Sequence, residues 1–217
     1  MATNTDPAGP WSLVVPLKPL ARAKSRLARA AGEDARPRLA LAFAQDTVAA
    51  ALACSRVRDV VVVTDDAVAA AALSALGARI VPDAPGAGLN AALAHGARSV
   101  RALRPAAAVA ALNADLPALR TGELARVLDF ASAFPNAFLR DAAGIGTTFL
   151  AAVSGAEFRP AFGGPSGARH LASGAVEIAL SGVDSVRRDV DTGEDLRVAL
   201  ALGVGSHTAR IATAPAP

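Results

Sequence analysis

Three aspartates have the type and spacing of a metal site. Asp189 and Asp191 are two residues apart, so in an extended segment both side chains point to one face, about 6.5–7 Å apart along the chain. Two such carboxylates repel each other unless a cation lies between them. Together with Asp115 they offer the oxygen ligands that suit Mg²⁺. The alternative is a plain turn, "DVDTGEDL", in which Thr192 or Asp191 caps the last helix.

A loop with several cations follows the first apolar segment. The stretch "VVPLKPLARAKSRL" holds Lys18 and Lys24, the only lysines among 22 Lys and Arg residues, and then Arg26. A lysine is a compact charge that can reach a phosphate from a loop. The loop lacks the glycines of a P-loop, "GxxxxGK[ST]". It is therefore either a phosphate-binding loop of another kind or the exposed basic start of a helix.

A third feature is the glycine-rich segment "FGGPSGARHLASG", in which Ser166 opens a short predicted helix. Glycines such as Gly163 allow a ligand to approach the backbone closely, and the start of a helix attracts anions. The alternative is an ordinary N-cap serine after a loop. His170 lies one helical turn beyond Ser166, which makes it a candidate neighbour of the ligand. The loop "GIGTT" (144–148) adds glycines and hydroxyls, but it could equally be a hairpin turn.

Alternating strands and helices would position these residues. Predicted strands lie at 11–16, 58–64, 79–82, 106–113, 136–141, 147–153 and 185–192, most of them separated by predicted helices. This order favours a three-layer α/β/α Rossmann-like sandwich with a mostly parallel, mixed sheet. Ligands of such sheets collect at the carboxyl ends of the strands. We expect one domain over 11–207, a disordered N-terminal tail at 1–10 and a C-terminal tail at 208–217.

Composition narrows the class of protein. The 217 residues are 53% hydrophobic, the net charge is +3 and the pI is about 9.9, which is at most a bias towards small anionic ligands. Basic runs with interleaved aromatics are absent, so we expect no nucleic-acid partner. The one cysteine, Cys54, excludes an internal disulfide, and no His/Cys spacing suggests zinc. The sequence lacks a signal peptide and a long apolar run, which predicts a cytoplasmic protein without a membrane partner.

Six motifs in order resemble one known family. They are "VVPLKPLARAKSRLA", "GLNAAL", "LNADLPAL", "GTTFLAA", "FGGPSGARHLASGA" and "DVDTGEDL", spread over about residues 11–203. Together they resemble the guanylyltransferases that make the side-chain precursor of the deazaflavin coenzyme F-420. That family acts on 2-phospho-L-lactate or phosphoenolpyruvate. Its fold is the nucleotide-diphospho-sugar transferase type, in agreement with the predicted sandwich.

The resemblance implies a reaction and a role for each residue. GTP and a small phosphorylated carboxylic acid would react in line at the α-phosphorus, with pyrophosphate leaving and Mg²⁺ as cofactor. The implied roles are metal ligation by Asp115, Asp189 and Asp191, acceptor binding by Thr148, Gly163 and Ser166, contact with the GTP phosphates by Lys18, Lys24 and Arg26, and the nucleoside pocket at Gly88 and Asn90. The family's "GTG" turn reads "GIG" here, so either Thr147 or Thr148 could make the acceptor contact. Pro165 also removes one N–H donor.

Several functions remain open at this point. The alanine and arginine bias is typical of GC-rich actinobacteria, for which phosphoenolpyruvate is the expected acceptor, with 2-phospho-L-lactate and 3-phosphoglycerate as alternatives. Other nucleotidyltransferases of this fold usually carry a "GxGxR" signature after the first strand, and this chain lacks it. A non-catalytic nucleotide-binding module would retain GTP binding without the aspartates. A homodimer is also left open.

Overall fold

The computed structural model describes residues 11–22 and 35–212. Lys24, Arg26 and the predicted N-terminal tail lie outside the described residues. Within the described part, seven strands form one sheet. They are β1 (Trp11–Pro16), β2 (Val57–Val63), β3 (Arg79–Val81), β4 (Val109–Leu112), β5 (Asn136–Arg140), β6 (Thr147–Ala152) and β7 (Val176–Glu177).

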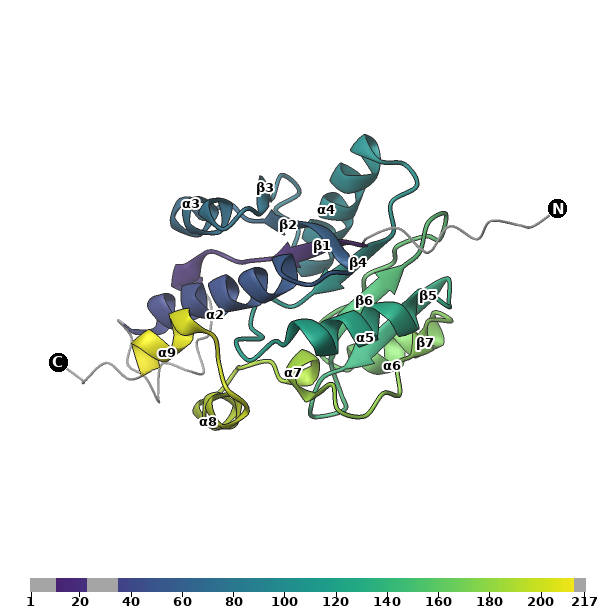
Figure 1. Cartoon of the computed structure of the whole chain (residues 1–217). Coiled ribbons are helices and arrows are strands. Elements are labelled where there is room, and N and C mark those ends of the chain that lie inside the picture. Colours follow the sequence, from purple (N-terminus) through teal and green to yellow (C-terminus); the bar gives the residue numbers. More distant parts are fainter. Residues whose placement is uncertain (1–10, 23–34, 213–217) are drawn as a thin grey trace.

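The strand order is β3-β2-β1-β4-β6-β5-β7 (Figure 1). The strand β6 runs antiparallel to both of its neighbours, while the other pairs of neighbouring strands are parallel. The sheet is therefore mostly parallel and mixed, with its antiparallel strand in the second half, as predicted. One consequence is that the start of β6 lies at the same edge as the carboxyl ends of β1, β4 and β5.

Helices cover both faces of the sheet, which confirms the three layers. They are η1 (Leu20–Arg22), α2 (Ala35–Leu52), α3 (Ala67–Ala75), α4 (Leu89–Leu103), α5 (Thr121–Ala131), α6 (Ser166–Ala172), α7 (Asp184–Arg187), α8 (Gly193–Leu202) and α9 (Ser206–Ala212). One core cluster packs α2, α3 and α5 against the sheet, and another packs α4 against its opposite face (Figure 1). Small alanines along α2 allow close packing, and the buried valine run of β2 forms a strand covered on both faces.

The strand predicted at 185–192 is wrong. Residues 184–187 form the short helix α7, and the segment after it belongs to no strand. The buried valines explain the difference, since Val183, Val186 and Val190 are spaced by three and four residues, which is helical spacing and not the alternation of a strand. The expected common face of Asp189 and Asp191 therefore cannot be derived from strand geometry. The two-residue strand β7 was not predicted.

The predicted C-terminal tail at 208–217 is also wrong in its first part. Residues 206–212 form α9, which ends beyond residue 207. The carboxylate of Asp46, on α2, accepts the N–H groups of His207 at 3.0 Å and of Thr208 at 2.8 Å. The capping residue lies about 160 positions earlier in the chain, so the sequence around residue 206 could not predict the start of α9.

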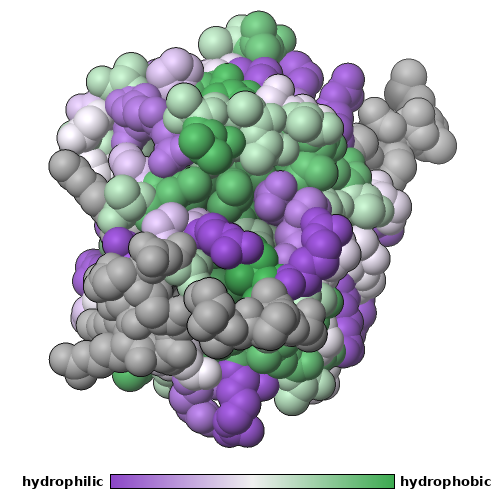
Figure 2. Space-filling view, turned by 90° about the vertical axis from the view of Figure 1, so that its left-hand side faces the viewer, coloured by the Kyte–Doolittle hydropathy of each residue, from purple (hydrophilic) through white to green (hydrophobic). Residues whose placement is uncertain are grey.

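The surface is mixed in polarity. Figure 2 shows one face of the molecule, on which an apolar area is bordered by hydrophilic residues. Alanine-rich helices contribute to this character, and the exposed large apolar side chains include Val68 of α3. Among the described residues, no helix combines the length and the apolar character that are needed to cross a membrane.

Candidate active site

A cavity of about 550 Å³ opens at the edge of the sheet where β1, β4 and β5 end and β6 begins. Its lining includes most of the site residues predicted from the sequence that the structure describes. These are Lys18, Asp115, Gly163, Ser166, Asp189 and Asp191. Segments from four distant parts of the chain therefore meet at one cavity, as the rule for the carboxyl ends of parallel strands predicts.

The carboxylates on one wall are brought together by the backbone between them. The N–H of Val190 donates to the main-chain oxygen of Asp115 at 3.0 Å, which ties the loop after α7 to the end of β4. The side chain of Val190 is fully buried and packs with Phe43 of α2. Because this valine points into the core, the aspartates on both sides of it, Asp189 and Asp191, can line the cavity.

These carboxylates do not by themselves form a complete metal cage. Within the described residues, no three His, Cys, Asp or Glu side chains are close enough to hold a metal ion. Mg²⁺ is usually held by one or two carboxylates together with water and substrate phosphates. The oxygen donors of this wall therefore fit a magnesium ion that arrives with a nucleotide. The assignment of Asp115, Asp189 and Asp191 as joint ligands stays a prediction.

A buried threonine on α2 fixes the position of Asp115. The hydroxyl of Thr47 lies 2.7 Å from the main-chain oxygen of Phe43 and 3.2 Å from that of Ala114, and it accepts the N–H of Leu116 at 3.0 Å. It thus holds the backbone on both sides of Asp115. The role of Thr47 was not predicted, because a threonine within an alanine-rich helix gives no local sign of this contact.

The alternative interpretation of "DVDTGEDL" is confirmed for one residue only. Thr192 forms a capping box with Asp195: its side chain accepts the Asp195 N–H, and the Asp195 carboxylate accepts the Thr192 N–H at 2.9 Å. The cap of α8 is therefore Thr192 and not Asp191. The motif combines both interpretations, because its threonine starts the helix while Asp191 lines the cavity.

Lys18 lines the same cavity as these carboxylates. Two bonds hold its loop: Leu17 N–H donates to the oxygen of Val63, and Leu20 N–H donates to the Asp66 carboxylate at 2.8 Å. Asp66 also caps α3, and the N–H groups that it accepts, first that of Ala69 and then that of Leu20, lower its pKa. Lys18 is the only basic residue that lines the cavity within the described part of the chain.

A β-bulge decides between the two threonines of β6. Leu139 of β5 pairs with Phe149, but the next residue, Arg140, pairs with Thr147, so Thr148 is the extra residue on β6. The cavity is lined by Thr147 and not by Thr148. The Thr148 side chain is fully buried, and its hydroxyl has no hydrogen-bond partner among the described residues. Of the two hydroxyls, the one at the cavity is therefore that of Thr147.

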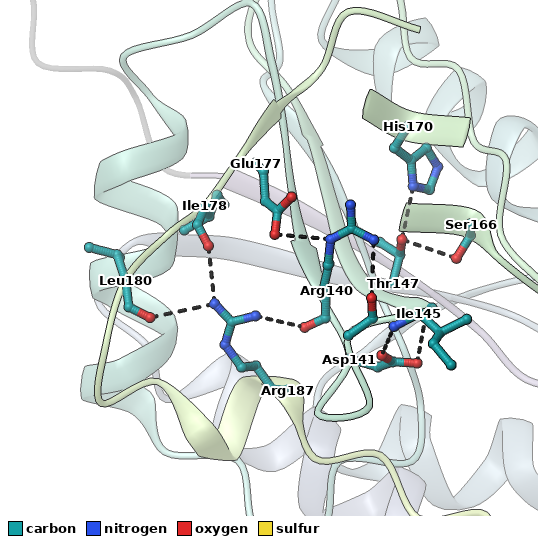
Figure 3. Close-up of polar contacts among 12 residues, drawn as sticks. Arg140, Asp141, Ile145, Thr147, Ser166, His170, Glu177, Ile178, Leu180 and Arg187 are labelled. Carbon is teal, nitrogen blue, oxygen red and sulfur yellow. Dashed lines mark hydrogen bonds and ion pairs between the residues drawn. The ribbon is translucent and has the colours of Figure 1, made fainter. Parts of the chain in front are cut away.

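A chain of hydrogen bonds joins Thr147 to the core (Figure 3). Thr147 Oγ1 lies 3.0 Å from His170 Nδ1 and 3.0 Å from Ser166 Oγ. His170 Nε2 accepts the N–H of Ala161 at 3.0 Å. Burial, with a smaller contribution from the charge of Arg169, lowers the pKa of His170 to about 4, so the imidazole is neutral. His170 thus lies directly behind Thr147 and is not itself part of the cavity lining.

The turn between β5 and β6 carries a fourth carboxylate, which sequence analysis missed. Asp141 lines the cavity, and its side chain accepts the N–H groups of Ile145 at 2.9 Å and Gly146 at 2.8 Å (Figure 3). Beside it, Arg140 pairs with Glu177 of β7 at 3.0 Å (Figure 3). An aspartate at the carboxyl end of the predicted strand 136–141 was the signal that could have identified Asp141.

The residues predicted for the nucleoside pocket, Gly88 and Asn90, have structural contacts beside the cavity, and their predicted role stays a prediction. Asn90 binds the main chain of Phe162 in both directions: it accepts the N–H at 2.7 Å and donates to the carbonyl at 3.1 Å. Its amide therefore holds the loop before Gly163. Gly88 adopts a φ of 94° at the start of α4, a conformation that favours glycine. Neither residue lines the cavity, whereas Leu89 between them does.

Solved structures identify the class of protein to which this fold belongs. A nucleotidyl transferase from Methanothermobacter is 22% identical, with a TM-score of 0.65 over 88% of this chain and 96% of its own. A Desulfovibrio desulfuricans protein, proposed to be a nucleotide-diphospho-sugar transferase, is 16% identical, with a TM-score of 0.66 over 88% and 86%. These likenesses confirm the predicted nucleotide-diphospho-sugar transferase fold.

The protein family of this chain can be identified more closely than its fold alone allows. Residues 11–211 match the family described as guanylyl transferase CofC like. A protein named phosphoenolpyruvate guanylyltransferase from Streptomyces coelicolor is 69% identical over 202 residues, which cover 93% of this chain and 95% of that protein. The chain belongs to this family and is a nucleotidyltransferase, which confirms the membership predicted from the six motifs.

Proposed function

We propose that this enzyme joins GTP to phosphoenolpyruvate, giving enolpyruvoyl-diphospho-guanosine and pyrophosphate on the route to coenzyme F-420. The observation that carries the proposal is the 69% identity, over nearly the whole of both chains, to a protein named phosphoenolpyruvate guanylyltransferase. The cavity supports it, since Lys18 and several carboxylates line one space. That arrangement suits a nucleotide triphosphate that arrives with a divalent cation.

The proposed reaction depends more on the alignment of GTP and the acceptor acid than on proton transfer. An oxygen of the acceptor phosphate attacks the α-phosphorus of GTP, and the bond from that phosphorus to the bridging oxygen of the β-phosphate breaks. Because the attacking phosphate is already anionic, no strong general base is needed. Alignment and charge neutralisation supply most of the rate. Lys18 holds the triphosphate in this proposal, and Lys24 and Arg26 join it from outside the described residues.

Mg²⁺ is the proposed cofactor, held by Asp115, Asp189 and Asp191. When bound, it would neutralise the phosphate charge that these carboxylates otherwise repel. The chain's own contribution is to hold the carboxylates in place, by Thr47 around Asp115 and by the buried Val190 between the other two. Asp141, on the neighbouring turn, adds negative charge to the same cavity.

The acceptor acid occupies the opposite end of the cavity in this proposal. Ser166 and Thr147 provide hydroxyls there, and Gly163 provides backbone that a ligand can approach, with a φ of 95°. Thr148, which the resemblance implied as an acceptor-binding residue, could contact the acid only through its backbone in this proposal, because its side chain is buried. The preference for phosphoenolpyruvate over 2-phospho-L-lactate or 3-phosphoglycerate rests on the related proteins, because the lining residues alone do not discriminate among these acids.

One assay tests the proposal directly. The purified enzyme is incubated with GTP, Mg²⁺ and each of the three acids separately, and the release of pyrophosphate is measured. Phosphoenolpyruvate is expected to give the highest kcat/KM, and CTP in place of GTP is expected to give little release. A lack of release with every acid would refute the proposed function, whereas a preference for another acid would correct only the acceptor. The cytoplasmic location and the homodimer stay predictions.

A further inference from the structure

The hydroxyl pair beside the cavity is connected to a buried histidine that the proposed reaction does not use. His170 is fully buried between the rings of Phe138 and Phe162, whose centroids lie 5.7 and 5.2 Å from its own. An apolar setting of this kind favours a neutral ring. Yet both ring nitrogens are engaged, one by Ala161 N–H and the other by Thr147 Oγ1. Buried polar atoms need such partners, and here one of the two partners, Thr147, also lines the cavity.

The partner of Nε2 determines the tautomer. A backbone N–H can only donate, so the nitrogen that receives it must carry a lone pair and no proton. In a neutral imidazole the proton is then on Nδ1, 3.0 Å from Thr147 Oγ1. The hydrogen-bond network thus assigns His170 as a donor to Thr147. Arg169 secures the same backbone, because its guanidinium donates to the Ala161 carbonyl at 2.9 Å.

Counting protons gives a result that does not depend on hydroxyl orientation. His170 Nδ1, Thr147 and Ser166 bring one proton each, and the two hydrogen bonds between them use two of the three. No other hydrogen bond of these two hydroxyls is present within the described residues. One hydroxyl proton is therefore left over, on whichever oxygen does not donate within the pair. Both residues line the cavity, so this proton is available to a ligand there.

We infer that His170 is a positioning residue of the acceptor subsite, which makes the Thr147–Ser166 pair present one proton to an anionic oxygen of the acceptor acid. This inference rests on the proposed function for the identity of the ligand. If the imidazole did not donate, Thr147 could turn its own proton inwards to Nδ1 and the pair would offer less to the cavity. The effect should therefore appear in the binding of the acid and not in that of GTP.

Two substitutions at the same position separate the donor from the packing. His170→Asn keeps an N–H near the position of Nδ1, whereas His170→Gln keeps an acceptor for Ala161 and loses the donor to Thr147. In His170→Gln the hydroxyl pair keeps its spare proton, but Thr147 is no longer held as an acceptor and can turn that proton away from the ligand. We expect the KM for phosphoenolpyruvate to rise by up to about tenfold, the value of one well-aligned hydrogen bond, and the KM for GTP to stay unchanged. His170→Asn should restore most of the loss. Equal effects on both KM values, or equal effects of the two variants, would overturn the inference.

A double-mutant cycle tests whether the histidine acts through Thr147. Thr147→Val removes the hydroxyl through which His170 would act, while it keeps the shape and leaves Ser166 with its own proton. In that background His170→Gln should raise the KM for the acid no further, because the imidazole no longer has a hydroxyl to orient. A further increase of about tenfold would show that the histidine acts independently of Thr147 and would contradict the inference.

The tautomer is measurable without turnover, so its test is separate from that of the proposed function. ¹⁵N NMR of histidine-labelled protein, with the His170 signals assigned by their loss in His170→Gln, should show a protonated Nδ1 and an unprotonated Nε2. Adding phosphoenolpyruvate without GTP should shift the Nδ1 signal. The opposite tautomer, or a signal that does not respond to the acid, would overturn the inference, even where the enzyme releases pyrophosphate.

Discussion

The two walls of the cavity are held in place in different ways. The carboxylate wall, formed by Asp115, Asp189 and Asp191, is fixed mainly through the backbone. The Thr47 hydroxyl hydrogen-bonds to the main chain on both sides of Asp115, and the Val190 N–H donates to the Asp115 carbonyl. The hydroxyl wall is fixed through side chains, from Ser166 to Thr147 to the buried His170. A wall of the first kind can lose a charge and keep its shape. In the second kind, shape and hydrogen-bonding capacity depend on the same side chains.

Replacing a carboxylate should therefore cost activity and not stability. Asp115→Asn is nearly isosteric and keeps the backbone contacts, while it removes one negative charge from the cavity. We expect turnover to fall by about 10²–10³-fold, as for the loss of one preorganised electrostatic group. The midpoint of urea unfolding should stay within error of the wild type.

The matched control for this substitution is Asp129→Asn, on the exposed surface where Asp129 pairs with Arg56. It removes the same charge far from the cavity and should leave turnover unchanged. Full activity of Asp115→Asn would refute the metal-binding role, and a large loss of stability would refute the distinction between the two walls.

The hydroxyl wall should instead affect stability, because the buried His170 makes the free energy of unfolding depend on pH. The pKa of His170 is lowered from 6.5 to about 4 in the folded protein, so the unfolded chain binds more protons between these values. The free energy of unfolding should then fall as pH drops from about 6.5 towards 4, by up to roughly 3 kcal/mol in total. Urea unfolding at several pH values measures this slope.

His170→Gln should flatten the slope, because the titrating group is gone. His95→Gln, which removes a histidine from α4, is the control and should keep the slope of the wild type. If the wild type and His170→Gln lose stability in parallel between pH 6.5 and 4, another group is responsible and the burial argument for His170 fails.

Substitution of Lys18, in the cationic loop, should have the smallest effect on the kinetics of the enzyme. Lys18 is exposed at the mouth of the cavity, where solvent weakens its attraction for phosphate. We expect Lys18→Ala to raise the KM for GTP about tenfold, with little change for the acid. Lys18→Arg keeps the charge and should recover part of the loss. An effect of Lys18→Ala on the acid alone would place the lysine at the other end of the cavity.

Sequence reasoning identified the carboxylate wall and much less of the hydroxyl wall, for a physical reason. Charged residues after apolar runs are visible locally, and the carboxyl ends of parallel strands meet at one edge, so Asp115 could be placed at the cavity from the sequence. Asp189 and Asp191 were grouped with it from a predicted strand that the structure does not contain, although both do line the cavity. The contacts of the hydroxyl wall depend on a bulge. One extra residue in β6 places Thr147, and not Thr148, against His170, and no local pattern marks it.

The same contrast holds for the fold. Most strands and helices follow from apolar periodicity and turn residues, which are local properties of the chain. The segment 185–192 was misread because its aspartates were taken to alternate with valines, although the buried valines recur with helical spacing. The helix α9 was missed because its cap, Asp46, lies on α2. The first error thus concerns a local pattern, and the second occurred where a residue distant in sequence supplies the stabilising contact.

The packing of the last helices on α2 has a consequence for synthesis. Val190, between two cavity aspartates, belongs to a small core shared by α2, α8 and α9, with Leu39 and Phe43 from α2. A nascent chain that has not yet released this end from the ribosome cannot complete that core, and Asp46 has no helix to cap. The loop of Asp189 and Asp191 would then lack its support. Translation products that end before α9 should therefore have no guanylyltransferase activity. The activity measured in cells should come only from chains that include the whole of α9.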